Sequence, residues 1–173
     1  MILSSQELKQ LYRGFLSQFG HPDPLGYIAR ALLESEGDPA YYGVDGKAGF
    51  LPVLPQRAAE MTGSSDVSTL QGNVTATITM DLMFMEQYRN VEDMIVAFHF
   101  GEEAVSPGEE DYTGRAKSFL ASVALLRPEV ASIVDPPRAT VNDVMKAIRD
   151  SLDGSIKTSK ITKDVVNKIL EER

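Results

Sequence analysis

The chain has no cysteine among its 173 residues, which excludes disulfides, thiolate metal sites and a cysteine nucleophile. It has only two histidines, His21 and His99, and neither has a partner at the spacing of metal ligands. The sequence therefore predicts no bound metal and no cofactor. It also lacks a long apolar run, because none approaches the roughly 20 residues that span a bilayer. Membrane insertion is not expected.

Basic residues are also in short supply. The chain has 17 lysines and arginines and 25 aspartates and glutamates, which gives a net charge of −8. No basic stripe is present to neutralise phosphates, so nucleic acid is excluded as the expected partner. The opening residues, MILSSQELKQLYRG, lack a basic segment followed by an apolar one, so no signal peptide is predicted. A role outside the cytoplasm would need another route of delivery.

What the chain does contain is typical of a globular, mainly α-helical protein. Hydrophobic residues make up 43% of it and charged residues 24%. Ser4 and Glu7 have the spacing of a capping box, which predicts a first helix there. Apolar residues at helical spacing predict further helices over residues 24–35, 91–100, 112–126, 140–152 and 161–172, with a short one from Pro55 to Gly63.

Residues 73–88 carry two conflicting patterns. Apolar and threonine side chains alternate from Val74 to Leu82, which is typical of a strand. The same stretch has Val74, Ile78, Leu82 and Met85 at helical spacing. Its length of about 16 residues exceeds that of a usual strand. Length favours a helix, whereas the threonine content favours a strand.

Two prolines in DPPRAT, residues 135–140, mark a linker. We therefore predict one domain over residues 1–135 and a C-terminal helical extension over residues 136–173. Pro128 is expected to end the helix that starts near Tyr112.

Three familiar motifs fail on inspection. GVDGKAG lacks the glycine–lysine–serine order of a phosphate loop, because Ala48 follows Lys47. The acidic stretch GEEAVSPGEED lacks the alternating oxygen ligands of a calcium loop. No Gly-x-Ser-x-Gly elbow is present for acyl transfer.

Four stretches, in this order, resemble the lytic transglycosylases, relatives of goose-type lysozyme that cleave peptidoglycan. They are ALLESEGDP, GKAGFLPVLPQRA, VAFHFGEEAV and DYTGRAKSFL. The first resembles the family's helix that ends in a catalytic Glu-Ser pair. The third resembles its Ala-Tyr-Asn-Ala-Gly motif, and Asn73 lies as far before Ala97 as the family's asparagine does. That spacing favours a helix for residues 73–88.

The resemblance implies a lysozyme-like helical fold and a glycosidase that acts on peptidoglycan glycan strands. It makes Glu34 the catalytic residue, acting as both general acid and general base. Substrate binding is implied for Ser35, Gly49, Phe50, Phe98, His99 and Tyr112. Leu32, Leu33 and Phe98 are the candidates for an apolar shell that keeps Glu34 protonated. Periodicity alone does not distinguish Glu34 from Glu36.

Several positions depart from the family pattern. Pro52 stands where the family has glutamine, Phe98 where it has tyrosine, and His99 where it has asparagine. Tyr41, Tyr42 and Tyr112 are the candidates for a replacement hydroxyl. These departures leave open a second interpretation, a catalytically degenerate lysozyme-like protein with a structural or adaptor role. A helical protein unrelated to wall enzymes is a third.

The size and composition of the chain fit a component of a bacteriophage virion. In that setting the particle would carry the protein to the bacterial cell wall or periplasm. The C-terminal helices would then dock on neighbouring virion structural proteins.

Overall fold

The computed structural model describes residues 2–105 and 112–135, which belong to one compact unit, Met1–Pro136. Helices dominate this part of the chain, which confirms the prediction of a mainly α-helical fold. The proposed extension, residues 136–173, lies outside the described residues, and so do its two predicted helices. No helix in the described ranges is long and apolar enough to cross a bilayer.

The N-terminal segment begins with the predicted capping box. Helix α1 spans Ser5–Gln10, and the backbone N–H of Glu7 donates to the Ser4 hydroxyl over 3.3 Å. The Glu7 carboxylate in turn accepts from the Ser4 backbone N–H over 2.7 Å. A π-helical segment, η1, Leu11–Leu16, continues the chain.

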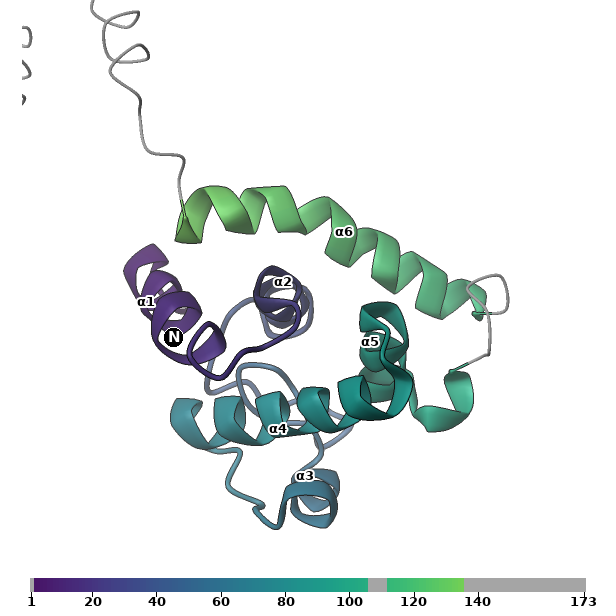
Figure 1. The fold of residues 1–173 in the computed structure, drawn as a ribbon. Helices are drawn as coiled ribbons and strands as arrows, with labels where there is room; N and C mark the ends of the chain where they lie inside the picture. The colour runs from purple at the N-terminus through teal and green to yellow at the C-terminus, as the bar shows by residue number, and fades with distance from the viewer. Residues whose placement is uncertain (1, 106–111, 136–173) are drawn as a thin grey trace, which may run out of the picture. The chain divides into compact units, whose positions relative to one another are not determined.

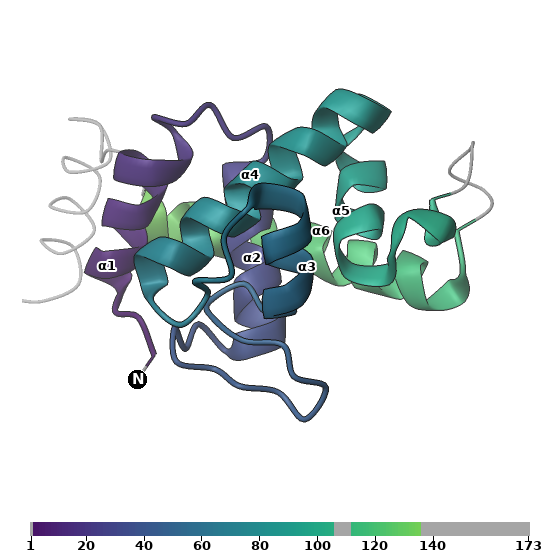
Figure 2. The ribbon, with the colours of Figure 1, turned by 90° about the horizontal axis from the view of Figure 1, so that it is seen from below.

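Helix α2, Pro24–Ser35, lies at the centre of the described fold. Figure 1 looks down its axis, with α6 on one side of it and α4 on the other; Figure 2 shows the same order from below. The Asp23 carboxylate caps its start by accepting from the Gly26 backbone N–H over 3.0 Å. The central position explains why Tyr27, Ile28 and Ala29 are all fully buried.

Helix α4, Leu70–Tyr88, settles the conflict over residues 73–88 in favour of a helix. The Thr69 side chain caps it. Two of the threonines that suggested a strand, Thr77 and Thr79, are accommodated in the helix because their hydroxyls donate to carbonyls one turn earlier. Helix α3, Pro55–Thr62, packs against α4 and ends at Gly63, as predicted. The loop before α3 forms isolated bridges of Ala48 with Tyr42 and Val53.

Helix α5, Val91–Phe100, ends at Gly101, and the 3₁₀ turn η2, Glu102–Ala104, follows. Helix α6, Gly114–Val134, then packs along α2.

The prediction that Pro128 ends this last helix was wrong. A proline inside a helix costs about 3 kcal/mol, in part because its nitrogen cannot bond the carbonyl one turn earlier. Here that carbonyl belongs to Ala124, which is exposed and can bond water. Val130 and Val134 are buried beyond the proline, so continued packing outweighs the lost bond.

Candidate active site

Two helix ends meet at Glu34 and His99. Each is the last but one residue of its helix, Glu34 on α2 and His99 on α5. Glu34 Oε1 and His99 Nδ1 lie 3.0 Å apart, which is hydrogen-bonding distance. The structure thus joins the predicted catalytic carboxyl to a side chain 65 residues away in the sequence.

The pair is enclosed unequally. The His99 side chain is only 2% exposed, whereas Glu34 retains 22%. Aromatic rings surround the imidazole, with centroid distances of 4.8 Å to Phe98, 4.5 Å to Phe119 and 6.4 Å to Phe100. The rings enclose the histidine. Of the residues predicted to form an apolar shell around Glu34, Phe98 packs against this imidazole, and Leu33 is 39% exposed.

Each partner has one polar atom left over. Glu34 Oε2 and His99 Nε2 are buried and have no hydrogen-bond partner in the described part of the chain. A buried polar atom without a partner costs about 1–3 kcal/mol, so such atoms are uncommon and often mark functional sites. The hydrogen-bonding capacity of both atoms is therefore unused within the described residues.

Burial lowers the pKa of His99 below its usual value, because the enclosed imidazolium loses its hydration. The hydrogen bond and charge of Glu34 oppose this shift without cancelling it. The ring is therefore neutral near pH 7 and carries a single N–H.

Glu34 and His99 open onto a groove of about 490 Å³. This volume is within the range of small-ligand pockets, about 300–1,000 Å³. Its described lining is Glu34, Lys47, His99, Phe100, Arg115, Ser118, Phe119 and Ser122. Glu34 is the sole carboxylate in this set.

Ser35 does not face the groove. Its side chain is buried, 3% exposed, and its hydroxyl lies 2.6 Å from the Phe50 carbonyl and 2.8 Å from the Ala31 carbonyl. The same oxygen accepts from the Gly37 backbone N–H over 3.2 Å. The described contacts of Ser35 therefore join the end of α2 to the following loop.

Gly49 and Phe50 are also interior. Gly49 has φ +97°, and a Cβ there would lie 2.1 Å from Asn73 Nδ2, so no larger residue fits. Asn73 holds this loop by donating to the carbonyls of Ala48 and Leu51 and accepting from the Leu51 N–H. Phe50 is fully buried. The loop's backbone is occupied by these internal bonds.

Phe98 and Tyr112 also face inward. Phe98 is 4% exposed, and the Arg30 guanidinium lies 5.3 Å from its ring centroid. Tyr112 is 5% exposed and donates its hydroxyl to Asp93. Among the other candidate hydroxyls, Tyr42 is 77% exposed, and neither it nor Tyr41 lines the groove. Of the seven predicted site residues, only Glu34 and His99 line it.

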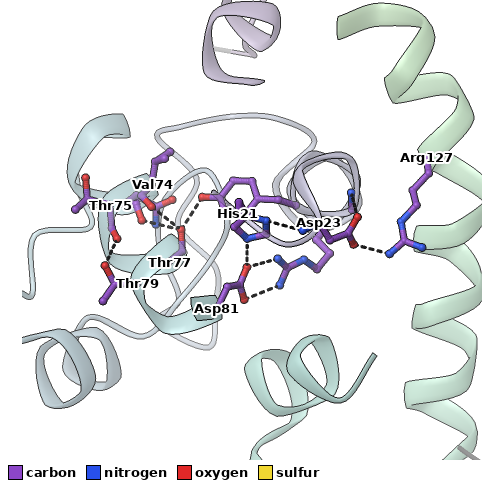
Figure 3. Close-up of polar contacts among 12 residues, drawn as sticks. His21, Asp23, Val74, Thr75, Thr77, Thr79, Asp81 and Arg127 are labelled. Carbon is purple, nitrogen blue, oxygen red and sulfur yellow. Dashed lines mark hydrogen bonds and ion pairs between the residues drawn. The ribbon is translucent and has the colours of Figure 1, made fainter. Parts of the chain in front are cut away.

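A second carboxylate–histidine pair lies deeper, between α2 and α4 (Figure 3). Asp81 accepts from both terminal nitrogens of Arg30, and its Oδ2 lies 2.9 Å from His21 Nε2. The Asp23 backbone N–H donates to His21 Nδ1 over 3.0 Å, which leaves the proton on Nε2 to bond Asp81. Arg127 of α6 donates to the Asp23 carboxylate over 2.5 Å. This network links three helices.

Sequence reasoning missed most of the groove's lining. Ser118 and Ser122 lie one helical turn apart on α6, and Phe119 lies between them. A helical wheel places these positions together, but only the tertiary contact of α6 with α2 and α5 directs them toward Glu34. Lys47 and Arg115 come from a loop and a helix start, with no pattern in the sequence that links them.

A smaller pocket of about 340 Å³ lies between α3 and α4 and is lined mainly by hydroxyl groups. Among the described residues of its wall, Asp66 is the one carboxylate, it accepts from the Ser68 hydroxyl over 3.1 Å, and there is no histidine. It therefore offers polar contacts without an acid–base pair. The groove at Glu34 is the stronger candidate for chemistry.

In the described ranges, no group of three or more histidine, aspartate or glutamate side chains is arranged to hold a metal ion. Comparison of the chain with protein-family models, curated proteins and solved structures found no match in any of the three. The site is therefore interpreted from its own geometry.

Proposed function

We propose that the chain cleaves peptidoglycan glycan strands as a lytic transglycosylase does, with Glu34 as the single general acid and base. The observation that supports this most is the state of the Glu34 carboxyl. One oxygen is bonded to His99, and the other is buried in the wall of a groove without a partner. That second oxygen is where a transferable proton would reside.

His99 would set the position of that proton. A neutral imidazole that donates Nδ1–H to Oε1 leaves Oε2 as the protonated oxygen of a carboxylic acid. The same N–H would stabilise the carboxylate that forms once the proton has left.

The reaction then needs one carboxyl in two roles. Glu34 Oε2 protonates the glycosidic oxygen, and the bond between that oxygen and the anomeric carbon breaks. The sugar's own 6-hydroxyl bonds to the anomeric carbon and returns its proton to Glu34, which closes a 1,6-anhydro ring. A second carboxylate, as most glycosidases use, is not needed. The described lining of the groove fits this, because Glu34 is its sole carboxylate.

A second candidate is a lysozyme-like structural or adaptor protein without activity. It is favoured by the inward position of Ser35, Gly49, Phe50, Phe98 and Tyr112, whose described contacts hold the fold together.

Mass spectrometry of fragments released from purified sacculi distinguishes the two. We expect the native protein to release 1,6-anhydro-muropeptides. The rate of release by Glu34→Gln should be about 10²–10⁴-fold lower, which is the usual contribution of a general acid or base. Glu36→Gln is the matched control, because Glu36 is an exposed carboxylate two residues further on. Its activity should match the native protein's.

Products with a reducing end, lost in Glu34→Gln, would indicate hydrolysis instead of transglycosylation. No release by the native protein would overturn catalysis and favour the structural candidate. Equal loss in Glu34→Gln and Glu36→Gln would contradict the role assigned to Glu34.

A further inference from the structure

The groove carries two basic side chains beside the Glu34–His99 pair. Lys47 comes from the loop before α3, and Arg115 from the first turn of α6. Basic groups therefore outnumber carboxylates two to one in the described lining, whereas acidic groups outnumber basic ones 25 to 17 in the whole chain. The described lining therefore presents two cations to a ligand in a chain that is acidic overall.

Neighbouring groups orient both cations. The Arg115 guanidinium lies 5.9 Å from the centroid of the Phe100 ring. A guanidinium over a ring face does not spend its N–H donors on that contact, and a carboxylate can bind two of them. Lys47 Nζ lies 3.4 Å from Asp45 Oδ2, and its side chain is 33% exposed, so it still reaches solvent and a ligand.

The serines of the groove suit a sugar. Ser118 Oγ donates to the Gly114 carbonyl over 2.8 Å, and Ser122 Oγ donates to the Ser118 carbonyl over 3.0 Å. Each hydroxyl proton is thereby used, so each oxygen offers the groove an acceptor. Sugar hydroxyls can donate to these oxygens, and the cations remain for a charged group.

We propose that this groove selects a glycan that bears carboxylates, with one carboxylate bound between Lys47 and Arg115 while Glu34 meets the glycosidic oxygen. The inference rests on the proposed function and adds to it the charge of the substrate. A neutral glycan of the same backbone lacks the group that the two cations bind.

Binding measurements by calorimetry test the proposal, with Glu34→Gln as the background so that no ligand is consumed. The probes are neutral N-acetylchitotetraose, a tetrasaccharide of alternating N-acetylglucosamine and N-acetylmuramic acid with free lactyl carboxylates, and the same tetrasaccharide with stem peptides. Lys47→Gln and Arg115→Gln are each combined with Glu34→Gln and compared with Glu34→Gln alone. Lys117→Gln is the matched control, because Lys117 is an exposed cation of α6 that is not part of the groove's lining.

We expect at least one carboxylated probe to bind about tenfold or more tightly than chitotetraose, the usual effect of a charge-assisted hydrogen bond. Lys47→Gln and Arg115→Gln should each remove most of that preference, because they weaken the carboxylated probe far more than chitotetraose, and Lys117→Gln should leave the preference intact. A preference confined to the peptide-bearing probe assigns the bound carboxylate to the peptide. A preference confined to the free lactyl probe assigns it to the sugar, because the stem peptides convert the lactyl carboxylates into amides.

Equal binding of charged and neutral probes would overturn the inference, and so would the binding of none. Equal weakening of all probes by the two substitutions would overturn it as well. Cleavage of sacculi without a charge preference would refute this inference alone. A charge preference that depends on Lys47 and Arg115, without cleavage, would refute the proposed function alone.

Discussion

The chain contains two carboxylate–histidine pairs of nearly equal length and very different surroundings. Asp81 and His21 are 2.9 Å apart, and both side chains are 0% exposed. Glu34 and His99 are 3.0 Å apart, and Glu34 reaches a groove. In both, a helix carboxylate meets a distant histidine, so the contact itself does not distinguish structural from chemical roles.

The difference lies in the atoms left over. Both oxygens of Asp81 have donors, and both ring nitrogens of His21 have partners. Oε2 of Glu34 and Nε2 of His99 have none in the described residues. Nε of Arg30 and Nε of Arg127, near the deeper pair, also lack partners, so the contrast holds for the two carboxylate–histidine pairs themselves. A pair whose atoms are all bonded stabilises one arrangement, whereas a pair with unbonded atoms has capacity for a substrate. This contrast is the reason that we propose a chemical role for Glu34 and a structural role for Asp81.

The largest effect that the comparison predicts is at Asp81. Asp81→Asn removes the charge that faces Arg30 and leaves a fully buried guanidinium uncompensated. Removal of one partner from a buried ion pair costs about 3–5 kcal/mol. We expect the free energy of unfolding, measured by urea titration, to fall by that amount.

Arg30→Met combined with Asp81→Asn is the control, because it removes both charges and should recover much of the loss. A loss below about 1 kcal/mol in Asp81→Asn would show that the pair does not hold the helices together.

Part of this contrast is visible in the sequence. The helical stripe of residues 24–35 and the capping residues around it predict α2, and the resemblance selects Glu34 in place of Glu36. Arg30 lies on the same helix, but its sequence context predicts a surface residue, because arginine is almost never fully buried unless it is paired. Its partner is 51 residues away, inside a stretch that also fits a strand. No local pattern links the two.

The site residues show the same limit. Glu-Ser, Gly-Phe and the histidine after Phe98 identify positions near the groove, but not which way each side chain points. Ser35 follows Glu34 directly and yet is buried, because successive residues of a helix point about 100° apart. The cations Lys47 and Arg115 reach the groove only through tertiary packing.

The two pairs should also differ in the pH range over which they affect the free energy of unfolding. The lowered pKa of His99 means that the unfolded chain binds a proton below about pH 6.5 while the folded chain does not. Stability from this group is complete above that pH and is lost as pH falls toward the lowered value. The slope it contributes is at most about 1.4 kcal/mol per pH unit.

Burial alone would raise the pKa of Asp81, but the charge of Arg30 and the bonds from His21 and Arg30 lower it below the usual 3.8. Its contribution is therefore present above about pH 3.8 and is lost below it. The amide of His99→Gln can still donate to Glu34. This variant should flatten the dependence of the free energy of unfolding on pH just below pH 6.5, and it should leave the loss of stability below about pH 3.8 unchanged. An unchanged profile in His99→Gln would contradict the burial assigned to the ring.

The smallest effect on stability is expected at the residue with the largest expected effect on activity. Glu34→Gln keeps the volume of the side chain and an oxygen that can accept from His99, and it excludes an ionised carboxylate, which is unfavourable at the end of a helix by about 0.3–1 kcal/mol. Its free energy of unfolding should therefore stay level or rise by up to about 1 kcal/mol, a trade of stability for activity seen at many active sites. Urea titration beside Asp81→Asn measures this directly. If Glu34→Gln destabilised the fold as much as Asp81→Asn, both pairs would be structural, and the case for Glu34 as an acid would lose its physical basis.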